Sequence, residues 1–197
     1  MAETPLVAFL EMISAFALPL GASSSLHKDA DALGLSLAEF LDAIAKDWKD
    51  QGFYGTGHLP PEWANKRSIY RLQVTGPGWW VDVEHPDSIA AIRNALGPIL
   101  HAETGLDHLD TGILRGGSRD VTTRIASWVR ASTLDDGSLP LGLRYGSKHG
   151  GGCSWAYWLR RRDDGFGDDR MVADMGNEIT PSTKGYREAM GLLNLDA

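Results

Sequence analysis

The sequence predicts a single mixed α+β domain that covers residues 1–197. Some segments repeat apolar residues at helical spacing, whereas others show the alternation or the short apolar runs of strands. No internal repeat, coiled coil or low-complexity tract separates them. With 43% hydrophobic and 23% charged residues over 197 positions, the chain has the length and composition of one folded domain.

The first part of the chain is predicted to be helical. Thr4 and Pro5 supply a cap and a first-turn proline, and apolar residues then recur at helical spacing: Leu6, Phe9, Leu10, Ile13 and Phe16. A second helix is predicted from Ser36 to Lys49, because Ser36 and Glu39 have the spacing of a capping box. Residues 21–28, which lie between these helices, are predicted to form a polar loop.

The middle of the chain is predicted to hold a β-hairpin followed by two helices. Residues 67–74 and 79–83 alternate apolar and polar side chains on either side of a Thr-Gly-Pro-Gly turn. A helix is predicted from Asp87 to about Leu100. Another is predicted over residues 119–128, where the apolar side chains lie along one side.

Two apolar strands with a glycine-rich connection dominate the last third. Residues 141–145 and 153–159 are the predicted strands, and a final helix is predicted at about residues 183–193. The connection carries Ser147 and then three successive glycines at 150–152. Because glycine has no Cβ, backbone there can come close to a ligand. We therefore expect the functional site at this connection.

Composition excludes several classes of function. The net charge of −7, from 19 basic and 26 acidic residues, argues against nucleic acid as the main partner. The lone Cys153 cannot form an internal disulfide, and the six histidines lack metal-ligand spacing, so we expect no metal. The apolar stretch 5–20 lacks a preceding basic region, and Glu3 and Glu11 accompany it, which predicts neither a secretion signal nor a membrane segment. A cytoplasmic protein is expected.

Several motifs resemble those of RES domains. The run Gly-Leu-Arg-Tyr-Gly-Ser at 142–147, followed by Cys-Ser-Trp-Ala-Tyr-Trp at 153–158, resembles the family's closing "G-I-x-Y-x-S" and "C-W-A-L-F" segments. Residues 4–16 resemble the helix "T-P-L-A-A-F-L-E-V-L" that carries the RES glutamate. The weaker upstream likenesses lie at residues 59–67, 81–83 and 119–128. The resemblance spans about residues 4–195.

This resemblance implies an ADP-ribosyltransferase-like fold and a function. RES proteins are toxins of bacterial toxin–antitoxin pairs that consume NAD+ at the nicotinamide–ribose bond by hydrolysis or phosphorolysis. The family's roles then fall on Glu11 and Ser147 as catalytic residues and on Tyr145 as a cofactor-binding wall of the pocket. A small antitoxin protein is the implied partner, and self-association into a homo-oligomer and ADP-ribosylation of a protein remain open.

Each of these residues also has a purely structural interpretation. Ser147 can be a turn residue, Glu11 can lie on a solvated helix face, and Tyr145 can be a core aromatic. His149 is predicted to be an exposed loop residue and Cys153 a small core residue.

One part of the family pattern has no match in this sequence. The arginine-bearing segment that opens RES domains does not precede Thr4, so the fold is expected to lack its N-terminal portion. The alternative function is therefore an inactive remnant or an antitoxin-binding module.

Overall fold

The structure, a computed structural model, describes residues 1–18, 22–47, 55–60 and 62–195. It contains both helices and strands, which confirms the α+β class. The chain divides into two compact units, which we call the sheet unit (residues 1–3 and 71–174) and the helical unit (residues 4–70 and 175–197). A single domain stays a prediction, because two compact units can belong to one domain or to two.

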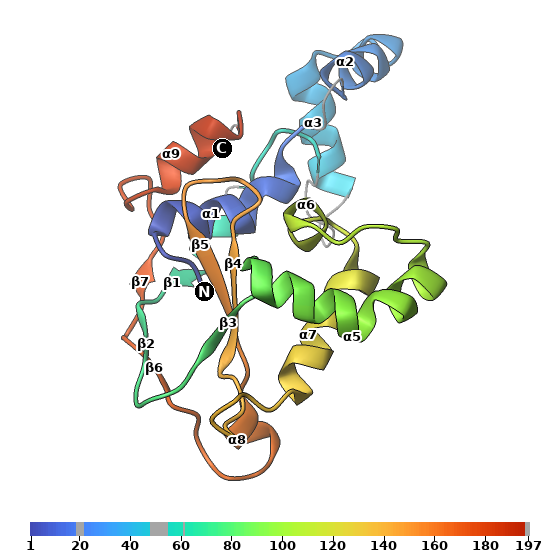
Figure 1. The fold of residues 1–197 in the computed structure, drawn as a ribbon. Coiled ribbons are helices and arrows are strands. Elements are labelled where there is room, and N and C mark those ends of the chain that lie inside the picture. The colour runs from blue at the N-terminus through green and yellow to red at the C-terminus, as the bar shows by residue number, and fades with distance from the viewer. Residues whose placement is uncertain (19–21, 48–54, 61, 196–197) are drawn as a thin grey trace. The chain divides into compact units, whose positions relative to one another are not determined.

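A three-stranded sheet organises the sheet unit. Strands β3 (Trp80–Asp82) and β4 (Gly142–Gly146) run parallel, and β5 (Cys153–Tyr157) pairs antiparallel with β4, giving the order β3-β4-β5 (Figure 1). The predicted pair of strands around the glycine-rich connection is thereby confirmed. Residues 1–3 lie along β5, where Ala2 forms an antiparallel bridge with Ser154.

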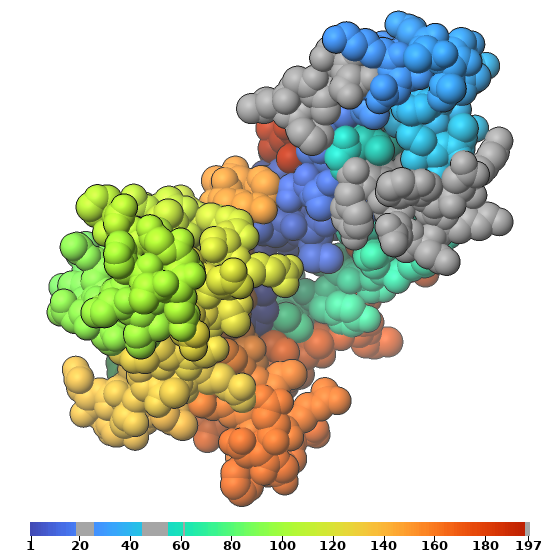
Figure 2. All heavy atoms as spheres, turned by 90° about the vertical axis from the view of Figure 1, so that its right-hand side faces the viewer, coloured from blue at the N-terminus to red at the C-terminus, as the bar shows by residue number. Residues whose placement is uncertain are grey.

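Helices cover the sheet and complete the core of this unit. The predicted helices are confirmed and extended as α5 (Pro86–Thr104) and α7 (Arg119–Ala131), with the short helices α6 (Thr111–Leu114) and α8 (Arg160–Asp163) nearby in sequence. The green α5 and the yellow α7 lie side by side in Figures 1 and 2. Their buried faces meet the sheet in one cluster: Val83, Ile92, Leu96, Leu100, Leu109, Val121, Ile125, Val129 and Leu143.

The predicted β-hairpin is wrong. Strand β2 (Leu72–Val74) pairs antiparallel with β6 (Met171–Ala173), whereas β3 pairs with β4. The amide of Thr75 donates to the Arg170 carbonyl (2.6 Å), and the Trp79 carbonyl accepts from the Leu141 amide (2.8 Å), so the two ends of the turn are attached to different neighbours. Alternation along a strand predicts its two faces but does not predict its partner.

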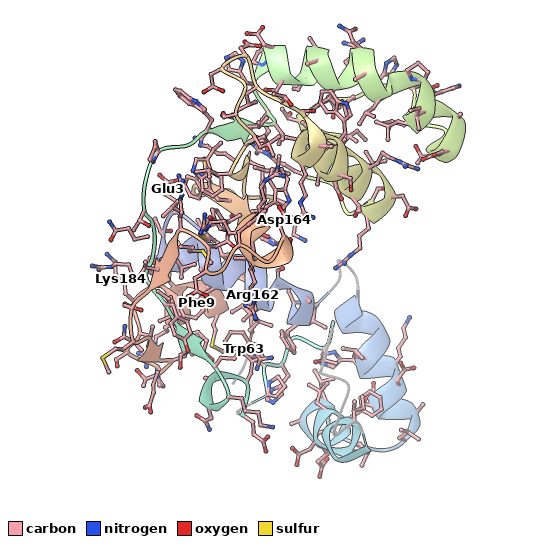
Figure 3. All side chains as sticks on the ribbon, turned by 90° about the horizontal axis from the view of Figure 1, so that it is seen from below. Glu3, Phe9, Trp63, Arg162, Asp164 and Lys184 are labelled. Atoms are coloured by element: carbon pink, nitrogen blue, oxygen red, sulfur yellow. The ribbon has the colours of Figure 1, made fainter. Side chains whose placement is uncertain are left out.

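The helical unit is built on α1 (Pro5–Ile13), which packs against α9 (Tyr186–Leu192). A 3₁₀ turn at Ser14–Phe16 follows α1, and the helix α4 (Glu62–Asn65) and the strand pair β1 (Ser68–Ile69) with β7 (Asn177–Glu178) lie in the same unit. Its core contains Phe9 and Trp63, both labelled in Figure 3. The final helix is confirmed, although it begins only at Tyr186.

Local capping explains where two helices begin. Thr4 Oγ1 accepts the Val7 amide (3.2 Å), as predicted for the start of α1. Helix α3 (Leu37–Asp47) begins with the predicted capping box, in which the Ser36 amide donates to Glu39 Oε2 (2.9 Å) and the Glu39 amide donates to Ser36 Oγ (3.2 Å). The last two predicted residues of this helix lie outside the described residues.

The predicted polar loop at residues 21–28 is wrong, since helix α2 (Ala22–Ala32) covers all of it except residue 21, which lies outside the described residues. The sequence Ala-Ser-Ser-Ser-Leu-His-Lys-Asp has no regular apolar stripe, so periodicity gave no indication of a helix. Packing against α3 and burial of Ala30 supply the stabilisation that this sequence lacks by itself.

Candidate functional site

A cavity opens in the sheet unit where the parallel strands β3 and β4 end. Parallel strands place their carboxyl ends at the same edge of a sheet, which is where open α/β sheets bind ligands. We call it the Ser147 cavity; its volume is about 510 Å³. Its lining combines carboxylates, guanidinium groups and a glycine loop: Asp82, Glu84, His85, Pro86, Arg115, Arg144, Gly146, Ser147, Gly150, Gly151, Gly152 and Cys153.

The ion pair between Arg115 and Glu84 forms one wall of the cavity. Arg115 donates from Nε to Glu84 Oε1 (2.8 Å) and from Nη2 to Oε2 (2.5 Å), and the Gly146 amide also donates to Oε1 (2.9 Å). The Glu84 side chain is 14% exposed. The hydrogen bonds from Arg115, followed by that from the Gly146 amide, hold the pKa of Glu84 below its usual range despite partial burial. Glu84 is therefore charged at neutral pH.

A second ion pair lies at the ends of β3 and β4. Arg144 Nη1 donates to Asp82 Oδ2, and its Nη2 donates to the sulfur of Cys153 (3.0 Å). Both charged side chains are partly exposed. Cys153, predicted as a core residue, is instead half-buried and lines the cavity. The two arginines and two carboxylates of the cavity balance one another in formal charge.

Ser147 lies at the start of the glycine loop and is only 1% exposed. Its hydroxyl oxygen accepts the His149 amide (3.2 Å), its carbonyl accepts the Gly150 amide (3.1 Å), and its amide donates to the Gly152 carbonyl (3.0 Å). These bonds close the loop within residues 147–152. Gly150 and Gly151 both have φ near +77° in this turn, a conformation that favours glycine.

Ser147 therefore has a clear structural role in this turn, and it also belongs to the lining of the cavity while being almost fully buried. His149 was expected to be exposed; it is half-buried, and its amide takes part in this turn.

Tyr145 and Glu11 lie elsewhere within their units. Side chains alternate along a strand, so Arg144 faces the Ser147 cavity while Tyr145 packs against the core cluster of α5 and α7. Tyr145 is absent from the described lining of the cavity. Glu11 is half-buried on α1 of the helical unit, between the buried Leu10 and the exposed Met12. Roles for Tyr145 and Glu11 in a common site stay predictions.

Sequence reasoning missed four charged residues of the cavity: Asp82, Glu84, Arg115 and Arg144. The predicted hairpin concealed them, because it paired residues 79–83 with the preceding segment instead of with β4. A parallel pairing of β3 and β4 would have placed Asp82 beside Arg144. Arg115 follows a four-residue helix and had no periodic pattern to identify it.

The arrangement suits an anionic or polyhydroxylated ligand better than a metal ion. Both guanidiniums are fixed by carboxylates, and planar guanidiniums bind phosphate oxygens through paired donors. Arg115 keeps Nη1 for a further bond, since its hydrogen bonds to the described residues use only Nε and Nη2. Among the described residues, no group of three or more histidines, cysteines and carboxylates is placed to hold a metal.

Comparison with known proteins found no relative. No family model matches this sequence, and searches of curated proteins and of solved structures found no match to it either. In the part of the chain that the structure describes, no helix has both the length and the apolar character of a membrane span.

Proposed function

We propose that the chain is a RES-type enzyme that consumes NAD+ by breaking the bond between nicotinamide and ribose. The observation that carries the proposal is the Ser147 cavity, which joins two arginines and a glycine loop at the ends of β3 and β4. Its volume of about 510 Å³ lies within the range of small-molecule sites. The motif at residues 142–158 supports the same activity.

The cavity supplies groups that match the charged part of the substrate. The pyrophosphate is bound by Arg115 and Arg144, which take the place of the arginine that RES domains carry near their start. Glycines 150–152 let backbone amides approach the phosphate oxygens without interference from Cβ atoms. The Ser147 hydroxyl hydrogen-bonds a ribose oxygen next to the bond that breaks.

The reaction breaks the bond between ribose C1′ and the ring nitrogen of nicotinamide. The bonding electrons move to the positively charged ring, which leaves as neutral nicotinamide, and positive charge develops on the ribose. A carboxylate stabilises such an oxocarbenium-like centre, and the RES resemblance gives this role to Glu11. Water then adds to C1′ and loses a proton to give ADP-ribose, or phosphate adds to give the ADP-ribose phosphate ester.

Other parts of the proposal follow from the family resemblance. If a nucleophilic side chain of a protein takes the place of water or phosphate, the same reaction transfers ADP-ribose to that protein. The enzyme acts in the cytoplasm and is held inactive by a small antitoxin that covers the cavity, and self-association into a homo-oligomer stays open.

One observation favours a second candidate, a binding module without catalysis. Both cavity arginines are already paired with Glu84 and Asp82, and Ser147 Oγ accepts a bond from its own loop. In such a module the polar groups of the cavity serve to stabilise the sheet edge. This module would keep the antitoxin contact and would leave NAD+ intact.

Nicotinamide release tests the enzyme directly. The purified full chain is incubated with NAD+, and the products are separated by chromatography and identified by mass spectrometry. Glu11→Ala and Ser147→Ala are each expected to lower the rate about 100-fold or more, because the RES resemblance gives both residues catalytic roles. Arg144→Gln is expected mainly to raise KM, because it weakens binding of the pyrophosphate.

Two matched variants serve as controls. Ser154→Ala removes another buried serine of the same sheet, which is 3% exposed, and Glu62→Gln removes an exposed carboxylate of the helical unit. Both are expected to keep full activity. Nicotinamide release that is unchanged in Glu11→Ala and Ser147→Ala would reject the assigned roles, and absence of release from the unmodified chain would favour the binding module.

A further inference from the structure

A second cavity in the sheet unit lies apart from the Ser147 cavity and shares none of its described lining residues. It has a volume of about 500 Å³ and lies beside the first residues of β3, between the start of α5 and the end of α7. Three of the seven tryptophans of the chain line it, namely Trp79, Trp80 and Trp128. We call it the tryptophan cavity.

Trp79 is exposed and yet held in one orientation. The indole is 62% exposed, and its Nε1 donates to Asp136 Oδ2 (2.7 Å). Asp136 is itself fixed, because its Oδ1 accepts from both the amide (2.9 Å) and the hydroxyl (2.6 Å) of Ser138. An exposed apolar ring that is fixed in this way offers its face to a ligand with little loss of side-chain entropy on binding.

The charge around this cavity is negative. Asp135 and Asp136 both line it, and none of its described lining residues is basic. Asp135 makes no hydrogen bond or ion pair with the described residues, so its carboxylate remains available. The hydrogen bonds from Ser138, and then the one from Trp79, hold the pKa of Asp136 below its usual range, which keeps this carboxylate charged at neutral pH.

We propose that the tryptophan cavity binds a small organic cation with an aromatic or quaternary alkyl body. The apolar body contacts the exposed indole face of Trp79, and such a face attracts cations through the ring quadrupole. The positive charge lies toward Asp135 and Asp136. The enclosed volume suits a small molecule, and the carboxylates disfavour an anion such as the phosphate-bearing ligand proposed for the Ser147 cavity.

Nuclear magnetic resonance of the indole N–H groups tests this site with benzyltrimethylammonium as the probe. The probe is titrated into the full chain, and the tryptophan signals are assigned by single substitutions. We expect saturable shifts of the Trp79 and Trp128 signals, while Trp63 in the helical unit does not respond and Trp80, whose ring packs against Tyr157 (5.9 Å between ring centroids), shifts less. Benzenesulfonate, an anion of similar size, is expected to cause no saturable shift, because the carboxylates repel it.

Three variants separate the aromatic and charged contributions. Trp79→Ala is expected to weaken binding about tenfold or more, and Asp135→Asn several-fold, in line with the loss of one cation–π contact or one opposite charge. Asp164→Asn removes an exposed carboxylate outside the cavity and is expected to leave binding unchanged. Asp135→Asn also keeps the test valid if Trp79→Ala fails to fold, because Asp135 is exposed and its side chain makes no hydrogen bond or ion pair with the described residues.

Three results would overturn the proposal. These are the absence of saturable shifts at these indoles up to about 10 mM probe, equal binding of benzenesulfonate, and binding that neither Trp79→Ala nor Asp135→Asn weakens.

Discussion

Arg115 donates two parallel hydrogen bonds to Glu84, at 2.8 Å and 2.5 Å, although the two residues lie 31 positions apart in the sequence. The pair connects the end of α6 to the segment that follows β3. The Gly146 amide adds a third bond to the same carboxylate. One carboxylate thus links three segments of the sheet unit at the edge of the Ser147 cavity.

Removing the charge of Glu84 is expected to destabilise the sheet unit at neutral pH. Arg115 lowers the pKa of Glu84 from its usual 4.5, so this carboxylate contributes its stabilisation fully above about that pH and loses it as the pH falls through the lowered pKa. Glu84→Gln should therefore lower the free energy of unfolding by about 1–2 kcal/mol near pH 7. Urea denaturation followed by circular dichroism measures this difference.

The same measurement at low pH checks the cause. As the pH falls below the unfolded pKa and toward the lowered folded pKa, the difference between Glu84→Gln and the unmodified chain should shrink, so it should be smaller at about pH 3 than at pH 7. A difference that is equally large at about pH 3 and pH 7 would mean that the charge of Glu84 is not the source of the stabilisation.

Two glycines of β4 should respond differently to the same substitution. A Cβ on Gly146 would overlap the Arg115 guanidinium, which is the flexible end of a side chain and can move away. Gly146→Ala should therefore lower the free energy of unfolding by about as much as the Arg115–Glu84 pair contributes. A Cβ on Gly142 would overlap the Ala156 carbonyl in the neighbouring strand β5, where only the backbone can yield. Gly142→Ala should therefore destabilise the unit more.

A double-mutant cycle tests the explanation for Gly146. If the alanine acts by displacing Arg115, Gly146→Ala should add little to the loss already caused by Glu84→Gln. Fully additive losses would contradict this, as would a smaller loss for Gly142→Ala than for Gly146→Ala.

Pro98 is a site where the chain can be stabilised. This proline lies inside α5, where it lacks the amide that would donate to the preceding turn, and its side chain is exposed. Pro98→Ala is expected to raise the free energy of unfolding by about 1–3 kcal/mol. Pro86 begins the same helix, where a proline costs nothing, so Pro86→Ala should change stability by less than about 0.5 kcal/mol. The denaturant midpoint of Pro98→Ala should therefore lie above that of Pro86→Ala. Equal midpoints would mean that Pro98 does not destabilise α5.

In the helical unit, Gly185 should not tolerate a side chain. Its φ is +80°, and a Cβ would lie 2.6 Å from the Leu6 amide nitrogen, at the contact between α9 and α1. We expect Gly185→Ala to cost about 1–3 kcal/mol, because it adds backbone strain and separates the two helices. Gly191→Ala, in the last turn of α9 with open space around it, should be neutral or slightly stabilising. Thermal unfolding that is equal for the two variants would exclude the predicted close contact.

Local sequence information predicted most of the helices correctly. The beginnings of α1 and α3 depend on hydrogen bonds between residues three positions apart, and the stripe of α7 depends on residues four apart. The glycine-rich connection between β4 and β5 was predicted for a related reason, since its turn is closed by bonds within residues 147–152. Helix α2 was missed because its stabilisation comes from α3 and not from its own sequence.

The sequence by itself determined the α+β class, the main helices and the position of Ser147 beside a glycine turn, because these depend on interactions within a few residues. Only the tertiary structure decided which strands pair, and with that pairing the composition of the Ser147 cavity. Arg144 and Asp82 lie 62 positions apart, and the parallel pairing of β3 with β4 brings them together. The physical reason is that a strand presents the same unpaired backbone groups to every neighbour, so its partner is chosen by the packing of the whole unit.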